Sequence, residues 1–308
     1  MGVVTVPAML RDEVGDIEGM QIRSWDLHDP PADQDRIEVV VAPPWRAPWI
    51  TRLAELPALR GLQLGSAGYE HALRFLPTGV DLANAVGVHD TATAEMALAL
   101  ILAAQRDIPE FARAQPEGVW PGPRQRRSVA DSTAVIYGYG GIGRALARRL
   151  HACEVRVVAV ARRPRPGDGV VDQVYSASQL STVLPEASIL VVAAPLTAAT
   201  RGVLDASALA QLPDDALVVN VGRGPIIDTD ALVRECGTGR LRAALDVTDP
   251  EPLPPEHPLW TTSGVLVSPH TAGSTSAFEP RMARFVRSQL GAYQATGRLP
   301  HVVATGSN

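Results

Sequence analysis

The sequence predicts an α/β protein in two parts, a doubly wound parallel sheet in the larger part and a second, smaller α/β unit. Three observations support this fold class. The chain has 308 residues, which suggests about two domains. From residue 131 onward, apolar strand-like runs alternate with helical patterns in βαβ order. A glycine-rich turn, placed between a strand-like run and a helical pattern, opens this series.

The elements of the larger part follow from this alternation. Strand-like runs occupy residues 134–137, 155–160, 189–193, 217–221, 241–245 and 265–267. Helical patterns lie between them, for example over residues 178–184 and 229–235. The stretch 190–194 is apolar throughout, as expected of a strand that is buried on both faces. We therefore expect a parallel sheet with helices on both of its sides.

The smaller part has its own strand candidates, at residues 2–6, 37–41, 62–64 and 80–83. An apolar helical pattern covers 93–106, and a connection rich in Pro, Gly and Arg covers 115–128. The last helical pattern, 277–295, should pack back on the N-terminal part, because a single terminal helix seldom stands alone. The expected domains are 1–92 with 281–308, and 93–280.

The composition excludes several classes of function. All 28 basic residues are arginine, so Schiff-base chemistry and a P-loop lysine are excluded, because both need an amine. The net charge of −5 gives no sign of a nucleic-acid-binding face. The longest apolar run, 96–104, is too short to span a bilayer, and the N-terminus lacks the features of a signal peptide. Cys153 and Cys236 lie far apart, without metal-ligand spacing, and are expected to be unpaired in a cytoplasmic protein.

The glycine-rich turn carries the most specific signal. It reads Gly138-Tyr139-Gly140-Gly141-Ile142-Gly143, after an apolar run and before a helical pattern. The first glycine of the G-x-G-x-x-G pattern makes the tight turn, the second allows a pyrophosphate to approach the backbone, and the third allows close helix packing. The helix N-terminus offers free N–H groups to phosphates. The pattern predicts a dinucleotide-binding (Rossmann) domain, with a plain strand-to-helix turn as the alternative.

Polar side chains follow three of the expected strands. Arg223 follows one strand, Asp246 and Glu251 follow the next, and His270 follows the last. In a doubly wound sheet, ligands bind outside the carboxyl ends of the strands. We therefore expect these four side chains to converge where a cofactor sits.

These motifs together resemble the D-isomer-specific 2-hydroxyacid dehydrogenases. The resemblance rests on the glycine turn, on residues 212–228, and on 244–253 followed by 268–274; residues 195–197 and 200–202 also fit. It implies a flavodoxin-like substrate domain beside the Rossmann domain, and a homodimer built mainly through the nucleotide domain. It also implies hydride transfer between a nicotinamide and a 2-oxo or 2-hydroxy acid, in a cleft between the domains.

The resemblance assigns roles to the four polar residues. Arg223 would bind the substrate carboxylate and polarise the 2-oxo group. His270 would donate a proton to the carbonyl oxygen, and Glu251 would orient the imidazole and favour its charged form. Asp246 would bind the nicotinamide carboxamide. Each residue has an alternative reading: a surface salt bridge, a capped loop histidine, a solvated glutamate and a turn aspartate. The other implied cofactor contacts are Gly138, Tyr139, Gly140, Gly141, Ile142, Gly143, Pro195, Thr200, Val221 and Gly222.

The substrate side is less sharply marked. Residues 65–70 resemble the family loop whose backbone N–H groups hold the substrate carboxylate, so Ala67, Gly68 and Tyr69 are the expected contacts. Tyr69 could equally be a core aromatic residue. Trp120 either packs within the chain or, as in some relatives, reaches the active site of the partner subunit. Glu95 is expected to have a structural role.

The end of the second strand selects between the two nicotinamide cofactors. NAD-binding domains place an acidic residue there, about 20 residues after the glycine turn. Here Ala161 takes that position, and Arg162, Arg163 and Arg165 follow. A carboxylate would repel a 2′-phosphate, whereas a guanidinium can pair with it. The sequence therefore predicts NADP(H), bound by Arg162 first and Arg163 second; the alternative is a solvated arginine cluster with NAD(H).

The predicted function is that of a glyoxylate or hydroxypyruvate reductase-like enzyme. Dehydrogenases of other small anions, such as formate or phosphite, share the scaffold and remain an alternative. A nicotinamide-sensing corepressor is a second alternative, but Arg223, Glu251 and His270 argue against it, because sensing does not need a proton donor.

Overall fold

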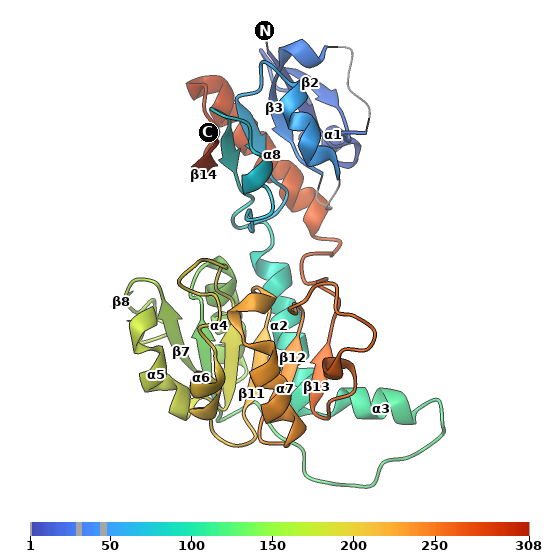
Figure 1. Cartoon of the computed structure of the whole chain (residues 1–308), viewed down its shortest axis with the longest axis vertical. Helices are drawn as coiled ribbons and strands as arrows, with labels where there is room; N and C mark the ends of the chain where they lie inside the picture. The colour runs from blue at the N-terminus through green and yellow to red at the C-terminus, as the bar shows by residue number, and fades with distance from the viewer. Residues whose placement is uncertain (1, 29–32, 44–47, 308) are drawn as a thin grey trace. The chain divides into compact units, whose positions relative to one another are not determined.

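The computed structural model describes residues 2–28, 33–43 and 48–307, which divide into two compact units (Figure 1). One unit contains both ends of the chain, residues 1–89 and 275–308, and is called the terminal unit below. The other, residues 90–274, is called the central unit.

The terminal unit is built on a six-stranded sheet in the order β14-β5-β4-β3-β1-β2. All neighbouring strands are parallel except β14, which runs antiparallel to β5. Apolar side chains alternate between the two faces of the sheet, so that Val3 packs in one core while Val4 and Val6 pack in the other. The strands are β1 (Val3–Val6), β2 (Gln21–Ser24), β3 (Ile37–Val41), β4 (Gly61–Gln63), β5 (Asp81–Ala83) and β14 (Val302–Thr305).

The last helix of the chain, α8 (Phe278–Thr296), belongs to this terminal unit and packs against α1 (Ala8–Val14). Arg287 Nη1 donates a hydrogen bond to the carbonyl oxygen of Val14 at 2.5 Å. The hydroxyl of Tyr293 donates to Glu38 Oε2 at 3.2 Å. Buried apolar side chains of α8 join the core formed by β1, β3 and α1. Both ends of the chain therefore stabilise the same sheet.

The central unit contains an eight-stranded sheet in the order β13-β12-β11-β10-β6-β7-β9-β8. Every neighbouring pair is parallel except β8 and β9. The strands are β6 (Thr133–Tyr137), β7 (Arg156–Ala161), β8 (Arg165–Pro166), β9 (Gln173–Ser176), β10 (Ile189–Val192), β11 (Leu217–Asn220), β12 (Arg242–Leu245) and β13 (Val265–Val267). The strand order reverses at β6, whose neighbours are β7 and β10, so the switch point lies between β6 and β10.

Helices cover both faces of the central sheet, which confirms the predicted doubly wound α/β fold (Figure 1). Val135 and Tyr137 of β6 pack in one core, and Ala134 and Ile136 pack in the other. The helices are α2 (Asp90–Gln105), α3 (Ile108–Ala114), α4 (Gly141–Ala152), α5 (Leu180–Val183), α6 (Ala206–Ala210) and α7 (Thr229–Gly237). Short 3₁₀ turns complete the two units, at Gln34–Arg36, Pro48–Glu55, Leu73–Phe75, Ala177–Gln179, Leu184–Glu186, Gly224–Ile226 and Pro258–Trp260.

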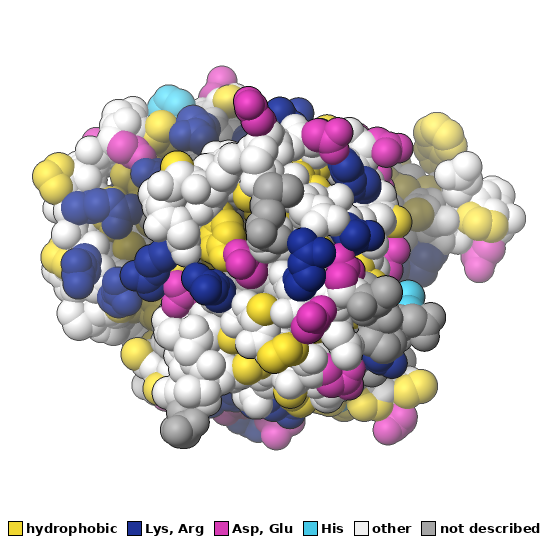
Figure 2. All heavy atoms as spheres, turned by 90° about the horizontal axis from the view of Figure 1, so that it is seen from above, with side chains coloured by type: hydrophobic (Ala, Val, Ile, Leu, Met, Phe, Trp, Pro, Cys, Tyr) yellow, Lys and Arg dark blue, Asp and Glu magenta, His cyan; other side chains and the backbone are white. Residues whose placement is uncertain are grey.

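The surface carries charges of both signs. Acidic and basic side chains both lie over the face in Figure 2, where every dark blue side chain is an arginine because the sequence has no lysine. Among the described residues, no helix is long and apolar enough to cross a membrane.

Three strands of the central sheet end level with one another. Asn220 of β11 pairs with Leu245 of β12, and Leu245 pairs with Val267 of β13. Each of these residues is the last of its strand. The segments that leave the three strands therefore start side by side at one edge of the sheet.

The packing of α4 on β6 gives the first prediction. A Cβ added at Gly143 would lie 2.3 Å from the backbone oxygen of Gly138, whereas one added at Gly140 would meet no heavy atom within 4 Å. Gly143→Ala should therefore lower the free energy of unfolding by about 1–3 kcal/mol and the melting temperature by several degrees. Gly140→Ala is the matched control and should have the same melting temperature as the wild type. Equal melting temperatures for both variants would contradict this packing.

Candidate active site

The glycine turn between β6 and α4 uses each of its three glycines differently. Gly138 has a φ of +113°, and a Cβ there would lie 2.3 Å from the backbone nitrogen of Ala194. Gly140 borders open space, and Gly143 fits closely against the turn. The tight turn, the open approach and the close packing expected from the sequence are therefore all present. Dinucleotide binding at this turn is the role that they suit.

The first turn of α4 also contacts the start of α2. A Cβ at Gly141 would lie 1.8 Å from Oδ2 of Asp90, so the missing side chain leaves room for this carboxylate. A carboxylate at a helix N-terminus is favoured by the helix dipole. Ile142, the next residue of α4, packs against the apolar core on this face of the sheet.

Tyr139 ties the glycine turn to the segment after β7. The side chain is buried, and its hydroxyl donates to the carboxylate of Asp168, 3.1 Å from each oxygen. Burial and the neighbouring Asp168 raise the pKa of Tyr139 to about 12, so the phenol stays protonated at neutral pH. Arg165 Nη2 donates to the backbone oxygen of Tyr139 at 2.5 Å, and its guanidinium lies 5.6 Å from the centre of the ring. Two residues of the segment after β7, Arg165 and Asp168, therefore hold the glycine turn in place.

The arginines after β7 occupy two kinds of position. Ala161 ends the strand, so no carboxylate is present at the position where NAD-binding domains place one. Arg162 and Arg163 are exposed and have no hydrogen-bond or ion-pair partner among the described residues. Arg165 is held on the glycine turn instead. The sequence grouped Arg165 with the other two and did not predict its contact with Tyr139.

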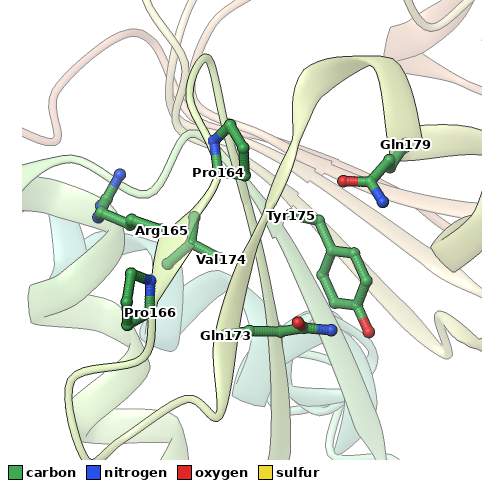
Figure 3. A pocket seen from close by; sticks show the side chains of 7 residues that line it. All are labelled: Pro164, Arg165, Pro166, Gln173, Val174, Tyr175 and Gln179. Atoms are coloured by element: carbon green, nitrogen blue, oxygen red, sulfur yellow. The ribbon is translucent and has the colours of Figure 1, made fainter.

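A hollow of about 470 Å³ lies beside the pairing of β8 with β9 (Figure 3). It borders the arginine-bearing segment but contains none of the four polar residues predicted at the strand ends. Its lining residues are Pro164, Arg165, Pro166, Gln173, Val174, Tyr175 and Gln179.

The ends of β10 and β11 complete the surroundings of the turn. Thr200 Oγ1 donates to the carbonyl oxygen of Pro195 at 2.7 Å and accepts from the N–H of Thr197 at 2.8 Å. Val221 is buried, and a Cβ at Gly222 would lie 2.8 Å from the backbone oxygen of Ala194. Pro195 and Thr200 therefore lie on the segment that leaves β10 at the switch point, and Gly222 packs against Ala194 of the same segment.

Arg223 follows β11 in an extended conformation, with φ −145° and ψ 140°. Its Nη1 donates to the carbonyl oxygen of Gly222 at 2.7 Å. Asn220 is 1% exposed and fixes this turn: its Oδ1 accepts from the N–H of Gly222 at 3.0 Å, and its Nδ2 donates to the carbonyl oxygen of Arg223 at 3.0 Å. Sequence reasoning missed this role, although a polar residue at the end of an apolar strand was the available signal.

His270 and Glu251 form a close pair. Nδ1 of His270 lies 2.7 Å from Oε1 of Glu251, and the side chains are 38% and 26% exposed. The histidine has a φ of +52°, and its N–H donates to the backbone oxygens of Asp246 and Ser268. The hydrogen bond between Nδ1 and Glu251 fixes the orientation of the imidazole ring, so that Nε2 lies on the side of the ring away from Glu251. Nε2 is thus the ring nitrogen that this pairing leaves unoccupied.

Asp246 braces the segment that carries His270. It is 2% exposed, and Oδ1 accepts from the hydroxyl of Ser268 at 2.6 Å and from the N–H of Thr271 at 3.0 Å. Oδ2 accepts from the N–H of Ala272 at 3.0 Å. A carboxylate oxygen can accept about two hydrogen bonds. Oδ2 therefore keeps capacity for one more donor beside the structural contacts.

The structure brings Arg223, Asp246, Glu251 and His270 to the same edge of the central sheet, on segments that leave β11, β12 and β13. The predicted substrate contacts Ala67, Gly68 and Tyr69 lie in the terminal unit, in the loop after β4. Tyr69 is half-buried and packs against one core of that unit.

Other residues named from the sequence have structural surroundings. Glu95 lies on α2 and forms a surface ion pair with Arg149 of α4, 3.4 Å between Oε1 and Nη2, in keeping with the structural role expected for it. Cys153 and Cys236 are free thiols, and burial raises the pKa of Cys236 to about 12. Within the part of the chain that the structure describes, no group of His, Cys, Asp and Glu could hold a metal ion.

A family model described as the NAD binding domain of D-isomer specific 2-hydroxyacid dehydrogenase matches residues 98–272. An uncharacterized protein from Corynebacterium melassecola is 39% identical over 195 residues, which cover 62% of this chain and 64% of that protein, just under two thirds. A glyoxylate reductase from Aeropyrum pernix is 34% identical over 260 residues, covering 80% of this chain and 77% of that enzyme.

Among solved structures, an NADPH-dependent glyoxylate/hydroxypyruvate reductase from Sinorhizobium meliloti, in complex with NADP and sulfate, has a TM-score of 0.81 and 28% identity. The match covers 98% of each chain. Together with the family model, these similarities confirm the resemblance seen in the sequence. The chain belongs to the D-isomer specific 2-hydroxyacid dehydrogenase family.

Proposed function

We propose that this NAD(P)-dependent oxidoreductase reduces a small 2-oxo acid, of the size of glyoxylate or hydroxypyruvate, and that NADPH is its reductant. The observation that carries the proposal is the pair of His270 and Glu251, 2.7 Å apart, on the strand-end segments that also present Arg223. Relatives that act as glyoxylate reductases support the substrate size.

The residues suit the two halves of a carbonyl reduction. NADPH, when bound, would supply the hydride for the carbonyl carbon. The carbonyl oxygen takes a proton from Nε2 of His270, and solvent then returns a proton to the imidazole. Glu251 holds Nδ1, keeps the ring oriented and stabilises the imidazolium. Arg223 binds the carboxylate of the substrate and polarises its carbonyl group.

The residues around the glycine turn fit NADP(H). Gly140 leaves open space for the approach of a pyrophosphate. Arg162 and Arg163 are exposed, have no partner among the described residues and could pair with a 2′-phosphate, and Ala161 stands in place of the carboxylate that would repel it. The free lone pair on Oδ2 of Asp246 suits the amide of a nicotinamide ring. NAD(H) lacks the 2′-phosphate and gains nothing from these arginines.

A homodimer is the proposed assembly. Figure 1 shows α3 and the loop after it extending away from the sheet of the central unit. Apolar side chains are exposed along this segment: Ile108 at 50%, Phe111 at 37%, Val119 at 54% and Trp120 at 94%. The alternative that Trp120 packs within its own chain does not fit a side chain so exposed. A second subunit would bury this surface.

The free thiols of Cys153 and Cys236 fit the expected cytoplasmic, reducing environment.

The catalytic role of His270 gives a direct prediction. His270→Gln should lower kcat for 2-oxo acid reduction by about 10²–10⁴-fold, because the proton donor is lost. NADPH binding, measured by fluorescence titration, should be unchanged. Glu251→Gln should lower kcat less, since Nδ1 of His270 keeps a hydrogen-bond partner, although that partner no longer carries a negative charge. Retention of wild-type kcat by His270→Gln would remove the proposed proton donor.

The two kinds of arginine after β7 should behave differently. Arg162→Ala should raise the KM for NADPH about 10-fold or more, since a charge-assisted hydrogen bond contributes about 1.5–3 kcal/mol. It should leave the KM for NADH nearly unchanged. Arg165→Ala should raise both constants by similar factors, because Arg165 braces the glycine turn that both cofactors use. The assignment fails if Arg162→Ala affects both cofactors equally.

The exposed apolar side chains of α3 and of the loop after it predict that the protein forms a dimer. Wild-type protein should sediment as a dimer, and Trp120→Ala with Phe111→Ser should shift it toward monomer at low micromolar concentration, because apolar surface at the interface is lost. Leu73→Ser, at an exposed apolar residue of the terminal unit, is the control. A monomeric wild type would overturn the proposed assembly.

A further inference from the structure

We propose that Asn84 and His89 are positioning residues for the substrate-carboxylate loop, residues 65–69. They hold the carbonyl groups of the loop in one orientation, so that a row of backbone N–H groups stays available to the carboxylate. The inference rests on the proposed function of this loop and adds the side chains that determine its geometry.

The loop has four successive carbonyl oxygens that all accept hydrogen bonds from the terminal unit. His89 Nε2 lies 2.8 Å from the oxygen of Gly65, and Asn84 Nδ2 donates to that of Ala67 at 2.7 Å. The N–H of Ala85 donates to the oxygen of Ser66 at 2.9 Å, and Ser66 Oγ donates to that of Gly68 at 2.7 Å. Two long-range side chains, Asn84 and His89, therefore hold alternate carbonyl groups of the loop.

The amide groups of the same loop have no such partners. Across residues 66–69, no backbone N–H donates to an acceptor among the described residues. Successive N–H groups that converge in a loop form an anion-binding concavity. The carbonyl oxygens of residues 65–68 accept hydrogen bonds, whereas the N–H groups of residues 66–69 meet no acceptor in the described part of the chain, so the loop suits a carboxylate.

The contacts of His89 and Asn84 are themselves fixed by the fold. The imidazole of His89 stacks on the ring of Phe278 at the start of α8, with centroids 5.2 Å apart and planes 14° apart. Phe278 is 8% exposed, so this ring is a rigid support. Asn84 directly follows β5, and the pairing of Gln63 with Ala83 places it beside the loop that leaves β4.

The orientation of the peptide groups matters because a peptide flip replaces an N–H donor with a carbonyl oxygen. A carbonyl oxygen turned toward a carboxylate would repel it. Asn84 and His89 oppose that flip at Ala67 and Gly65, since each flip would break a hydrogen bond. They act on the substrate through the loop, without touching the reacting atoms.

The test compares Asn84→Asp, His89→Ala and the control Met9→Ala, an exposed residue on α1. Asn84→Asp keeps the shape of the side chain but cannot donate to the oxygen of Ala67. In steady-state assays with glyoxylate, His89→Ala should raise the substrate KM about 5- to 10-fold, as expected for loss of one hydrogen bond. Asn84→Asp should raise it at least as much, because its carboxylate also repels the carboxylate of the substrate. The KM for NADPH and kcat should change less than about 2-fold. His89→Gln, whose amide can still donate, should recover part of the loss.

Hydrogen exchange of the backbone N–H groups of Ala72 and Ala85, which donate to the loop carbonyl oxygens of Tyr69 and Ser66, provides a readout that needs no turnover. It should be faster in Asn84→Asp and His89→Ala than in wild type and in Met9→Ala. Absence of 2-oxo acid turnover in the wild type would refute the proposed function, while the exchange rates would still decide the positioning role. Unchanged exchange, or equal effects on both KM values and kcat, would overturn the inference.

Discussion

The candidate active site depends on three parallel strands of the central sheet ending in register. Asn220, Leu245 and Val267 are paired across β11, β12 and β13, and each ends its strand. The residues that directly follow the three strands therefore start close together, at positions fixed by the sheet. A shift of one residue in any of these pairings would turn the side chains at that strand end to the opposite face. Parallel strand register is thus the constraint that allows distant parts of the sequence to form one site.

Two buried polar side chains convert this register into fixed geometry. Asn220 closes the turn that carries Arg223, and Asp246 collects three donors from the segment that carries His270. Burial of a carboxylate or amide is unfavourable unless its hydrogen bonds are satisfied. Here the satisfied groups are those next to the proposed catalytic residues. The energy that stabilises these two loops therefore also orients Arg223 and His270.

The sequence was sufficient for the doubly wound fold, because long apolar runs in βαβ order leave few other arrangements. It did not reveal β2, β8, β9 and β14. β2, β8 and β14 lie at the edges of the sheets, β9 lies next to an edge, and all four are short strands with mostly half-buried or exposed residues, so their apolar signal is weak. The 178–184 helix was recognised, but it consists of α5 between two 3₁₀ turns.

Within the candidate site, motif spacing could predict which residue types lie at the strand ends but not which partners they have. The role of Arg165 depends on the β8 pairing, which places its guanidinium on Tyr139. The contact of His89 with Gly65 joins residues 24 positions apart and depends on the β4–β5 pairing. Asp246 was predicted to face a cofactor, and its three internal donors became visible only once Ser268, Thr271 and Ala272 had been placed. Long-range partners of this kind are set by strand register, which local patterns do not encode.

The proposed reduction of a 2-oxo acid by NADPH can be tested by following the loss of reduced-nicotinamide absorbance with the wild-type protein. NADPH and NADH should be compared in parallel against glyoxylate, hydroxypyruvate, pyruvate and longer 2-oxo acids. We expect rapid turnover of one of the small acids with NADPH and much slower turnover with NADH. Turnover with NADH alone would contradict the cofactor assignment. Absence of turnover with both cofactors across all the acids would contradict the proposed reaction.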